Sequence, residues 1–159
     1  MTRFMLFAAL ALWPFAAIAQ EAGADAPADP AAEEQPAGFQ PIVADGVNLD
    51  DFLWRNRVVV VFAQSEFDPA FGEQMRNFEA RWPEMEERDV VVITDTDPAA
   101  MSSVRQKLRP RGFQLVLISK DGVVVLRKPF PWDVRELSRA IDKLPLRQEE
   151  IRLKRSGLQ

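Results

Sequence analysis

The stretch Val58-Val59-Val60-Val61-Phe62-Ala63 decides the fold of this chain. Its unbroken β-branched run is typical of a central strand covered on both faces, because a strand with one wet face alternates apolar and polar residues. A second run of this kind, Val90-Val91-Val92-Ile93, follows after a helical pattern. Strand, helix and strand in this order predict a right-handed βαβ unit with two parallel strands.

Helices are predicted on both sides of the second strand. Asp68-Pro69 and Asp97-Pro98 each fit an N-cap followed by the first helical residue, and the helices should end at Pro83 and Pro110. Large apolar residues recur at helical spacing in both segments: Phe71, Met75, Phe78 and Trp82 in the first, and Met101, Val104 and Leu108 in the second.

The remaining elements complete a mixed α/β pattern. Asn48 is expected to cap a short helix before the first strand. The apolar runs 115–118 and 123–126 flank Lys120-Asp121-Gly122, which predicts an antiparallel hairpin. A helix is expected from Trp132 to Leu144, and a short terminal helix should end before Gly157.

The N-terminus has the order of an export signal. Arg3, an apolar run and small residues up to Ala19 predict a secretory leader over residues 1–19, with an uncleaved anchor as the alternative. Residues 20–45 are rich in Ala, Pro and acidic residues and predict a disordered tether. The folded domain is expected over residues 46–159, in the periplasm or outside the cell, with no transmembrane span after cleavage.

The composition excludes several chemistries. The chain has 159 residues and contains neither cysteine nor histidine, so it offers no thiol, no Ser-His-Asp relay and no typical zinc site. We therefore expect no cofactor and no thiol oxidoreductase activity. From Asn48 onward there are 19 basic and 18 acidic residues, a balance that does not favour nucleic acid as a partner.

The order of elements resembles the thioredoxin fold, a three-layer α/β sandwich whose mixed sheet has a parallel βαβ half and an antiparallel hairpin half. That resemblance implies a redox pair directly after the first long strand. Here this place reads Gln64-Ser65-Glu66-Phe67-Asp68, without cysteine. The cis-proline that the fold implies before its hairpin has no counterpart at Gly112-Phe113 either.

A closer resemblance covers residues 46–152. The sequence is similar to a family of small, often exported bacterial proteins known as domain of unknown function 4174, for which no activity is established. Four segments carry the resemblance: Leu53-Trp54-Arg55-Asn56-Arg57, Glu87-Arg88-Asp89, Leu117-Ile118-Ser119-Lys120-Asp121-Gly122, and Ile141-Asp142-Lys143-Leu144-Pro145-Leu146-Arg147-Gln148-Glu149-Glu150.

Acidic loops follow both parallel strands. The carboxyl ends of parallel strands meet at one edge of a sheet, where ligands commonly bind. The carboxylates of Glu66, Asp68, Asp95 and Asp97 could therefore coordinate calcium or magnesium there. The alternative is that Asp68 and Asp97 only cap helices. Ser65 lies at the same edge, but no motif or histidine supports it as a nucleophile.

A second candidate site is basic. Arg105, Lys107, Arg109 and Arg111 could bind an anion or a partner, although residues spaced two apart do not share one helical face. Trp54, Trp82 and Trp132 are expected to pack in the core rather than form a ligand platform. The apolar stripe of the terminal helix either faces a partner or folds back onto the domain; it comprises Leu144, Leu146, Ile151 and Leu153.

Two functions follow from these patterns. The first is an exported, non-redox module that binds a protein or an anionic component of the cell envelope through the crevice loops and the basic surface. The alternative is an enzyme that uses the four loop carboxylates, with or without a bound divalent cation.

Overall fold

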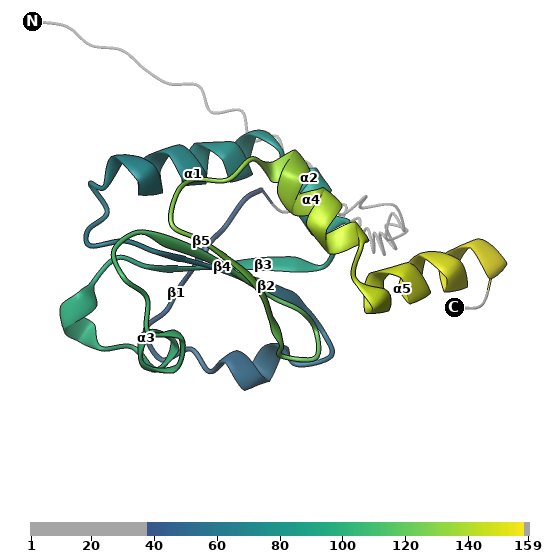
Figure 1. The fold of residues 1–159 in the computed structure, drawn as a ribbon, viewed down its shortest axis with the longest axis horizontal. Coiled ribbons are helices and arrows are strands. Elements are labelled where there is room, and N and C mark those ends of the chain that lie inside the picture. The colour runs from purple at the N-terminus through teal and green to yellow at the C-terminus, as the bar shows by residue number, and fades with distance from the viewer. Residues whose placement is uncertain (1–37, 158–159) are drawn as a thin grey trace, which may run out of the picture. The chain divides into compact units, whose positions relative to one another are not determined.

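The computed structural model describes residues 38–157, so the expected leader (1–19) and most of the expected tether lie outside the described residues. Figure 1 shows the chain path. The elements, in chain order, are β1 (Ile42–Val43), η1 (Leu49–Phe52), β2 (Arg57–Phe62), α1 (Pro69–Ala80), α2 (Trp82–Glu86), β3 (Val90–Asp95), η2 (Pro98–Ala100), α3 (Ser103–Leu108), β4 (Gln114–Ile118), β5 (Val124–Lys128), α4 (Val134–Asp142) and α5 (Pro145–Ser156).

The five strands form one mixed sheet in the order β1-β3-β2-β4-β5. β2 pairs in parallel with β3 along its whole length, from Arg57 opposite Val90 to Phe62 opposite Asp95. On its other side β2 pairs antiparallel with β4, which pairs antiparallel with β5. The predicted parallel half and hairpin half are therefore both confirmed.

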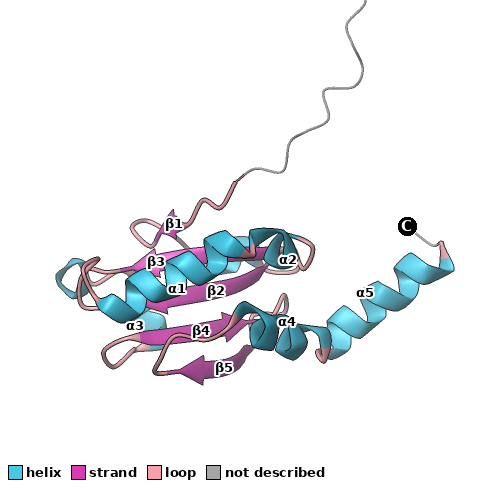
Figure 2. Cartoon of the chain, turned by 90° about the horizontal axis from the view of Figure 1, so that it is seen from above, coloured by secondary structure: helices cyan, strands magenta, loops and turns pink. Residues whose placement is uncertain are grey.

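β2 is buried on both faces, as its continuous apolar run predicts. Val59 and Val61 belong to the apolar core beneath α1, α2 and α4, whereas Val58, Val60 and Phe62 belong to a second core beneath η1 and α3. Figure 2 shows α1, α2 and α4 lying across one face of the sheet. The layer on the opposite face is much shorter, because α3 has six residues and η1 only four.

The ordered domain begins before residue 46, so the expected tether boundary is wrong. Ile42 and Val43 form an edge strand parallel to β3, and Ala44 is buried. Phe39 also packs against the rings of Phe78 and Trp82. The expected tether is dominated by Ala, Pro and acidic residues, but its last part contains one aromatic residue and a short apolar run. These residues were enough to extend the domain, because the free edge of β3 supplied backbone partners.

Two of the predicted helices are broken. The segment predicted to end at Pro83 divides at Arg81, and the proline lies in the first turn of α2 rather than at a helix end. The segment after Asp97 divides into η2 and α3. Met101 between them has a positive φ of 48° and is exposed, and Ser102 caps α3. Met101 is therefore not part of an apolar helix face.

The C-terminal elements agree well with the pattern. Asp133 caps α4, and Gly157 has the positive φ of a residue that ends a helix, as predicted for the terminal helix. The hairpin turn spans residues 119–123, so Val123 is not part of the strand. Gly122 has a φ of 81°, and a Cβ there would lie 2.8 Å from Leu53 Cδ2. The turn therefore packs closely against the residue that follows η1.

Candidate functional site

The loops after β2 and β3 share one edge of the sheet, as predicted, and Ala63 N–H donates to the Asp95 carbonyl at 2.9 Å. The four carboxylates expected there have separate roles. Asp68 accepts a hydrogen bond from Ala70 N–H at 2.9 Å and caps α1, and Asp97 does the same for Ala99 and η2. Glu66 is exposed.

Asp95 is the buried member of this set, and it is paired with Arg105. The guanidinium Nη2 lies 2.6 Å from Asp95 Oδ1, and it also donates to the carbonyl of Ala63, the first residue after β2. Ser102 Oγ donates to Asp95 Oδ2 at 2.6 Å. The Cζ atom of Arg105 lies over the ring of Phe62, 5.3 Å from the ring centroid. Both oxygens of Asp95 are therefore occupied by the protein itself.

These contacts do not assemble the expected cation site. Within residues 38–157, no three acidic, histidine or cysteine side chains lie close enough together to hold a metal ion. No lysine or carboxylate in this part of the chain hydrogen-bonds to Ser65 Oγ. Asp95 and Asp97 line a cleft of about 260 Å³ at this edge together with Asp45, and the carboxylate-based alternative stays a prediction.

The four basic residues do not form one surface. Arg105 is buried and points into the domain, toward Asp95. Lys107 pairs with Asp50 of η1 at 2.8 Å. Arg109 ends α3 with a positive φ of 49°, and it is exposed together with Arg111. The spacing of two residues predicted this division, because it turns alternate side chains to different sides of a short helix.

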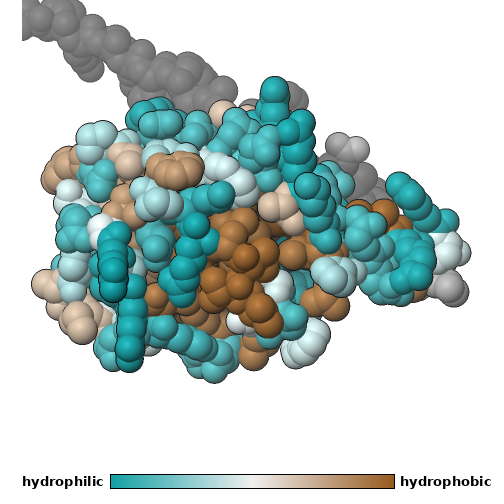
Figure 3. Space-filling view, in the orientation of Figure 1, coloured by the Kyte–Doolittle hydropathy of each residue, from teal (hydrophilic) through white to brown (hydrophobic). Residues whose placement is uncertain are grey.

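A groove opens on the short layer of the sandwich, a feature that the sequence patterns did not predict. It encloses about 370 Å³ between η1, α3 and the β4–β5 hairpin. Its apolar lining is contributed by Leu49, Phe52, Leu53, Val58, Leu108, Ile118 and Val124. Figure 3 shows apolar side chains exposed over the middle of the molecule and bordered by hydrophilic ones, in the region where Figure 1 places β2, β4 and β5.

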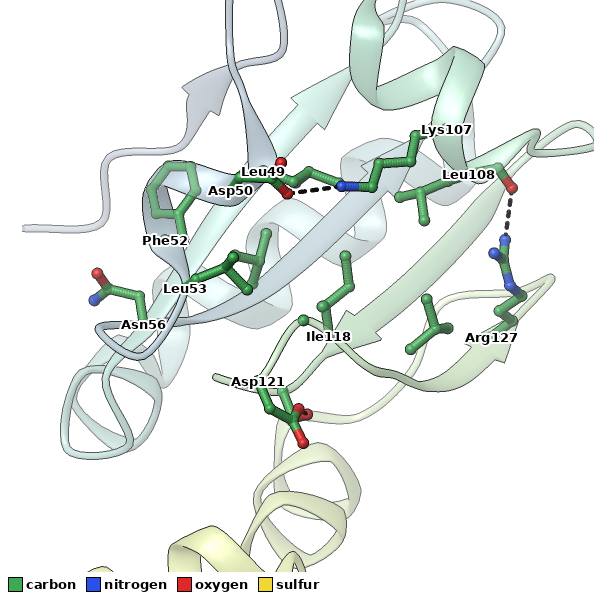
Figure 4. A pocket seen from close by; sticks show the side chains of 14 residues that line it. Leu49, Asp50, Phe52, Leu53, Asn56, Lys107, Leu108, Ile118, Asp121 and Arg127 are labelled. Atoms are coloured by element: carbon green, nitrogen blue, oxygen red, sulfur yellow. Dashed lines mark hydrogen bonds and ion pairs between the residues drawn. The ribbon is translucent and has the colours of Figure 1, made fainter.

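Polar contacts hold the walls of the groove in place. In Figure 4 the Lys107–Asp50 ion pair joins α3 to η1 at one end, and Arg127 reaches from β5 to the carbonyl of Leu108 at 2.8 Å. Asp121 lies at the opposite end of the groove. A hydrogen bond from Ser119 holds the pKa of the Asp121 carboxyl below its usual range, so this rim carries a stable negative charge. The groove is thus an apolar floor with charges of both signs around it.

A cluster of charged residues lies at the other edge of the sheet, where β2 and β3 begin. Arg57 has no exposed side-chain surface, and its Nη2 donates to Glu150 Oε1 of α5 at 2.9 Å. Lys120 Nζ bridges Glu150 Oε1 at 3.0 Å and Asp89 Oδ2 at 2.8 Å. Arg147 Nη1 lies 3.3 Å from Glu150 Oε2. One carboxylate therefore receives three cations.

The same cluster continues onto α4. Arg88 pairs with both carboxylate oxygens of Asp142, at 3.0 and 2.7 Å, and these contacts raise its pKa. Burial alone would raise the pKa of Glu150, but the hydrogen bonds from Arg57, Lys120 and Arg147 outweigh it and hold that pKa below its usual range. The cluster consists of Arg57, Arg88, Asp89, Lys120, Asp142, Arg147 and Glu150, and we call it the α5 clamp.

The three tryptophans expected in the core differ in exposure. Trp82 and Trp132 are half-buried and pack against the main apolar core. Trp54, in contrast, is 69% exposed, and the expectation of core packing is wrong for it. Leu144, the residue before α5, is half-buried, as are Leu146 and Ile151 of α5, while Leu153 is 42% exposed. The terminal helix therefore folds back onto the domain along its first turns and leaves its end uncovered.

Comparison with solved structures identifies the class of fold. The chain is similar to chloroplastic thioredoxin z, with a TM-score of 0.51 and 19% identity over 67% of this chain and 96% of that one. It is also similar to the reduced 2-Cys peroxiredoxin of Plasmodium vivax, with a TM-score of 0.53 and 16% identity over 65% and 85% of the two chains. The exposed lipoprotein thioredoxin Etrx1 of Streptococcus pneumoniae has a TM-score of 0.50 and 16% identity over 68% and 100%. At such identities the likeness concerns the fold, which is thioredoxin-like.

Residues 48–150 match the family described as Domain of unknown function (DUF4174), and the chain belongs to this family. No curated protein matches the chain. All seven residues of the α5 clamp come from the segments in which the sequence resembles the family, and the matched region ends at Glu150. The charges of these segments were visible in the sequence, but only the fold shows that they meet.

Proposed function

We propose that this protein is an exported, non-redox binding module of the cell envelope that receives apolar side chains of a protein partner in the groove between η1, α3 and the β4–β5 hairpin. Export rests on the leader pattern of residues 1–19. Absence of redox function rests on composition, because the chain contains no cysteine at the position of a thioredoxin redox pair or elsewhere.

The groove itself is the observation that carries the proposal. A volume of about 370 Å³ is within the range of small binding pockets, and its apolar floor remains open because the covering layer is short. An open apolar surface with polar residues around it is typical of a site that another molecule covers. Charges of both signs on the rim, from Lys107, Arg127 and Asp121, favour a protein partner, whose surface supplies charges of both signs.

The arrangement at the carboxyl edge supports the same proposal. Asp95 is paired with Arg105, and Asp68 and Asp97 cap helices, so three of the four carboxylates that an enzyme would use make structural contacts. In residues 38–157, none of the helices has the length and apolarity to cross a bilayer.

Adjacent valines where the hairpin turn meets β5 provide a matched test. Val124 lines the groove and is 37% exposed, whereas Val123 is 58% exposed and lies outside it. Val124→Asp should reduce the fluorescence of the apolar dye 1-anilinonaphthalene-8-sulfonate in the presence of the protein, and it should abolish co-purification of partners from detergent-solubilised envelopes. Val123→Asp should preserve both. Equal effects of the two variants would show that the groove is not the binding site.

A further inference from the structure

The backbone of the exposed Trp54 is fixed by contacts with other parts of the domain. Its φ of 62° is unusual for a bulky residue, and such strain persists only where the surroundings impose it. Trp54 N–H donates to the Lys120 carbonyl at 2.6 Å. Lys120 is itself anchored by Asp89 and Glu150 of the α5 clamp. The clamp therefore fixes the backbone that presents the indole to solvent.

The indole lies beside the uncovered end of α5. Trp54 lines a shallow cleft of about 210 Å³ together with Lys120, Leu146, Glu149, Glu150 and Leu153. Leu153 is 42% exposed, and Figures 1 and 2 show α5 extending away from the sheet beyond its contact with α4. Trp54 and Leu153 thus form a small apolar surface supported on both sides by ordered elements.

Unpaired positive charge borders this surface. Most described carboxylates of this edge are paired: Asp89 with Lys120, Glu87 and Asp142 with Arg88, Glu149 with Arg152 and Glu150 with Arg57. The exposed Glu86 and Asp121 have no cation partner within residues 38–157. Four exposed cations have no carboxylate partner within residues 38–157: Arg55, Lys143, Lys154 and Arg155. Arg55 adjoins Trp54 in sequence, and Lys154 and Arg155 follow Leu153.

We infer that the surface formed by Trp54, Leu153 and these four cations binds the headgroup layer of an anionic lipid bilayer. Tryptophan is enriched at the membrane interface because its amphipathic ring suits the headgroup level. A helix with an exposed leucine and clustered Lys and Arg can lie on such a surface, where each cation strengthens binding by about fivefold. The excess of positive charge favours anionic lipid over a protein surface of mixed charge. This inference does not depend on the groove.

The opposite edge of the sheet provides matched controls. Phe67 is 89% exposed, and Arg109 and Arg111 are exposed cations there. The full-length chain is sedimented with two kinds of vesicle. One is pure phosphatidylcholine, and the other contains about 30 mol% of the anionic lipid phosphatidylglycerol. All variants retain the same leader, so differences between them report on the described surface. Wild type should bind the anionic vesicles more tightly than the neutral ones.

Trp54→Asn should weaken binding to anionic vesicles by about tenfold, and asparagine tolerates the positive φ of this position. Lys154→Ala combined with Arg155→Ala should weaken it by about 25-fold and reduce its dependence on salt, since only Arg55 and Lys143 of the four cations remain. Phe67→Ala and the pair Arg109→Ala and Arg111→Ala should bind as wild type does. Far-UV circular dichroism confirms that each variant is folded.

Three results would overturn the inference. The first is equal binding to neutral and anionic vesicles, and the second is an equal loss in the opposite-edge controls. The third is a homodimer, measured by analytical ultracentrifugation, that Trp54→Asn converts to a monomer without any change in vesicle binding. In that last case a second copy of the chain, rather than lipid, covers Trp54.

Discussion

At the carboxyl edge of the sheet, Asp68 accepts a hydrogen bond from a backbone N–H only two residues ahead, whereas at the amino edge Arg57 and Glu150 join positions that are 93 residues apart. Both edges are rich in charge. Short-range bonds at the first edge begin helices, and long-range bonds at the second attach α4 and α5 to the sheet. The edge that supplies ligands in many α/β proteins is thus largely occupied here by structural contacts.

The largest effect should come from the buried ion pair of the carboxyl edge. Arg105→Met leaves the buried Asp95 without its cation, and breaking a buried pair in this way costs about 3 to 5 kcal/mol. Urea denaturation followed by circular dichroism measures the loss. Lys107→Met, on the same helix but exposed, should change the free energy of unfolding by less than about 0.5 kcal/mol. Similar values for the two variants would mean that the Arg105–Asp95 pair does not support the fold.

The α5 clamp should give the next largest effect. Glu150→Ala leaves the fully buried guanidinium of Arg57 with only the Asp89 carboxylate, 3.9 Å away, and we expect a cost of about 2 to 3 kcal/mol. Glu149→Ala is the matched control, since Glu149 is exposed and pairs only with the exposed Arg152. Protection of α5 amides from hydrogen exchange should fall in Glu150→Ala alone. If the α5 amides are equally protected from exchange in both variants, the clamp does not hold the helix.

Part of the contribution of the α5 clamp to the free energy of unfolding should be lost at low pH. The pKa of Glu150 is lowered in the folded state, so its contribution is complete above the ordinary glutamate pKa of about 4.3 and declines as the pH falls through the lower folded value. The difference in unfolding free energy between wild type and Glu150→Gln should therefore narrow below about pH 4. A difference that stays constant down to pH 2 would assign the stabilisation to packing rather than charge.

The helix caps of the carboxyl edge should give the smallest effect. Asp68→Ala removes the N-cap of α1 and should cost about 1 kcal/mol, while Asp68→Asn should restore most of it. Glu66→Ala, which removes an exposed carboxylate without a structural bond, should be neutral within about 0.5 kcal/mol. Thermal unfolding in the presence and absence of calcium checks the cation hypothesis at the same time. A rise in melting temperature with calcium that is lost in Glu66→Ala would revive that hypothesis.

Patterns that depend on neighbouring residues were predictable. The run from Val58 to Ala63 indicated a strand buried on both faces, and Asp68, Asp97 and Gly157 were recognised as helix boundaries. Breaks inside helices were not predicted at Arg81 and Met101, because apolar spacing continues across both positions. The exposed position of Trp54 was also missed, since its backbone is held by Lys120, a residue remote in sequence.

By itself, the sequence determined that this chain forms a mixed α/β domain and contains no thiol or imidazole for catalysis, because periodicity and composition are local properties of a chain. Only the tertiary structure decided which charges meet and which apolar residues remain uncovered. Arg105 turned from a surface cation into the buried partner of Asp95, and four separate segments converged in the α5 clamp. Such contacts depend on the distances that folding imposes between remote residues, and the groove depends on α3 being too short to cover the face that β4 and β5 present.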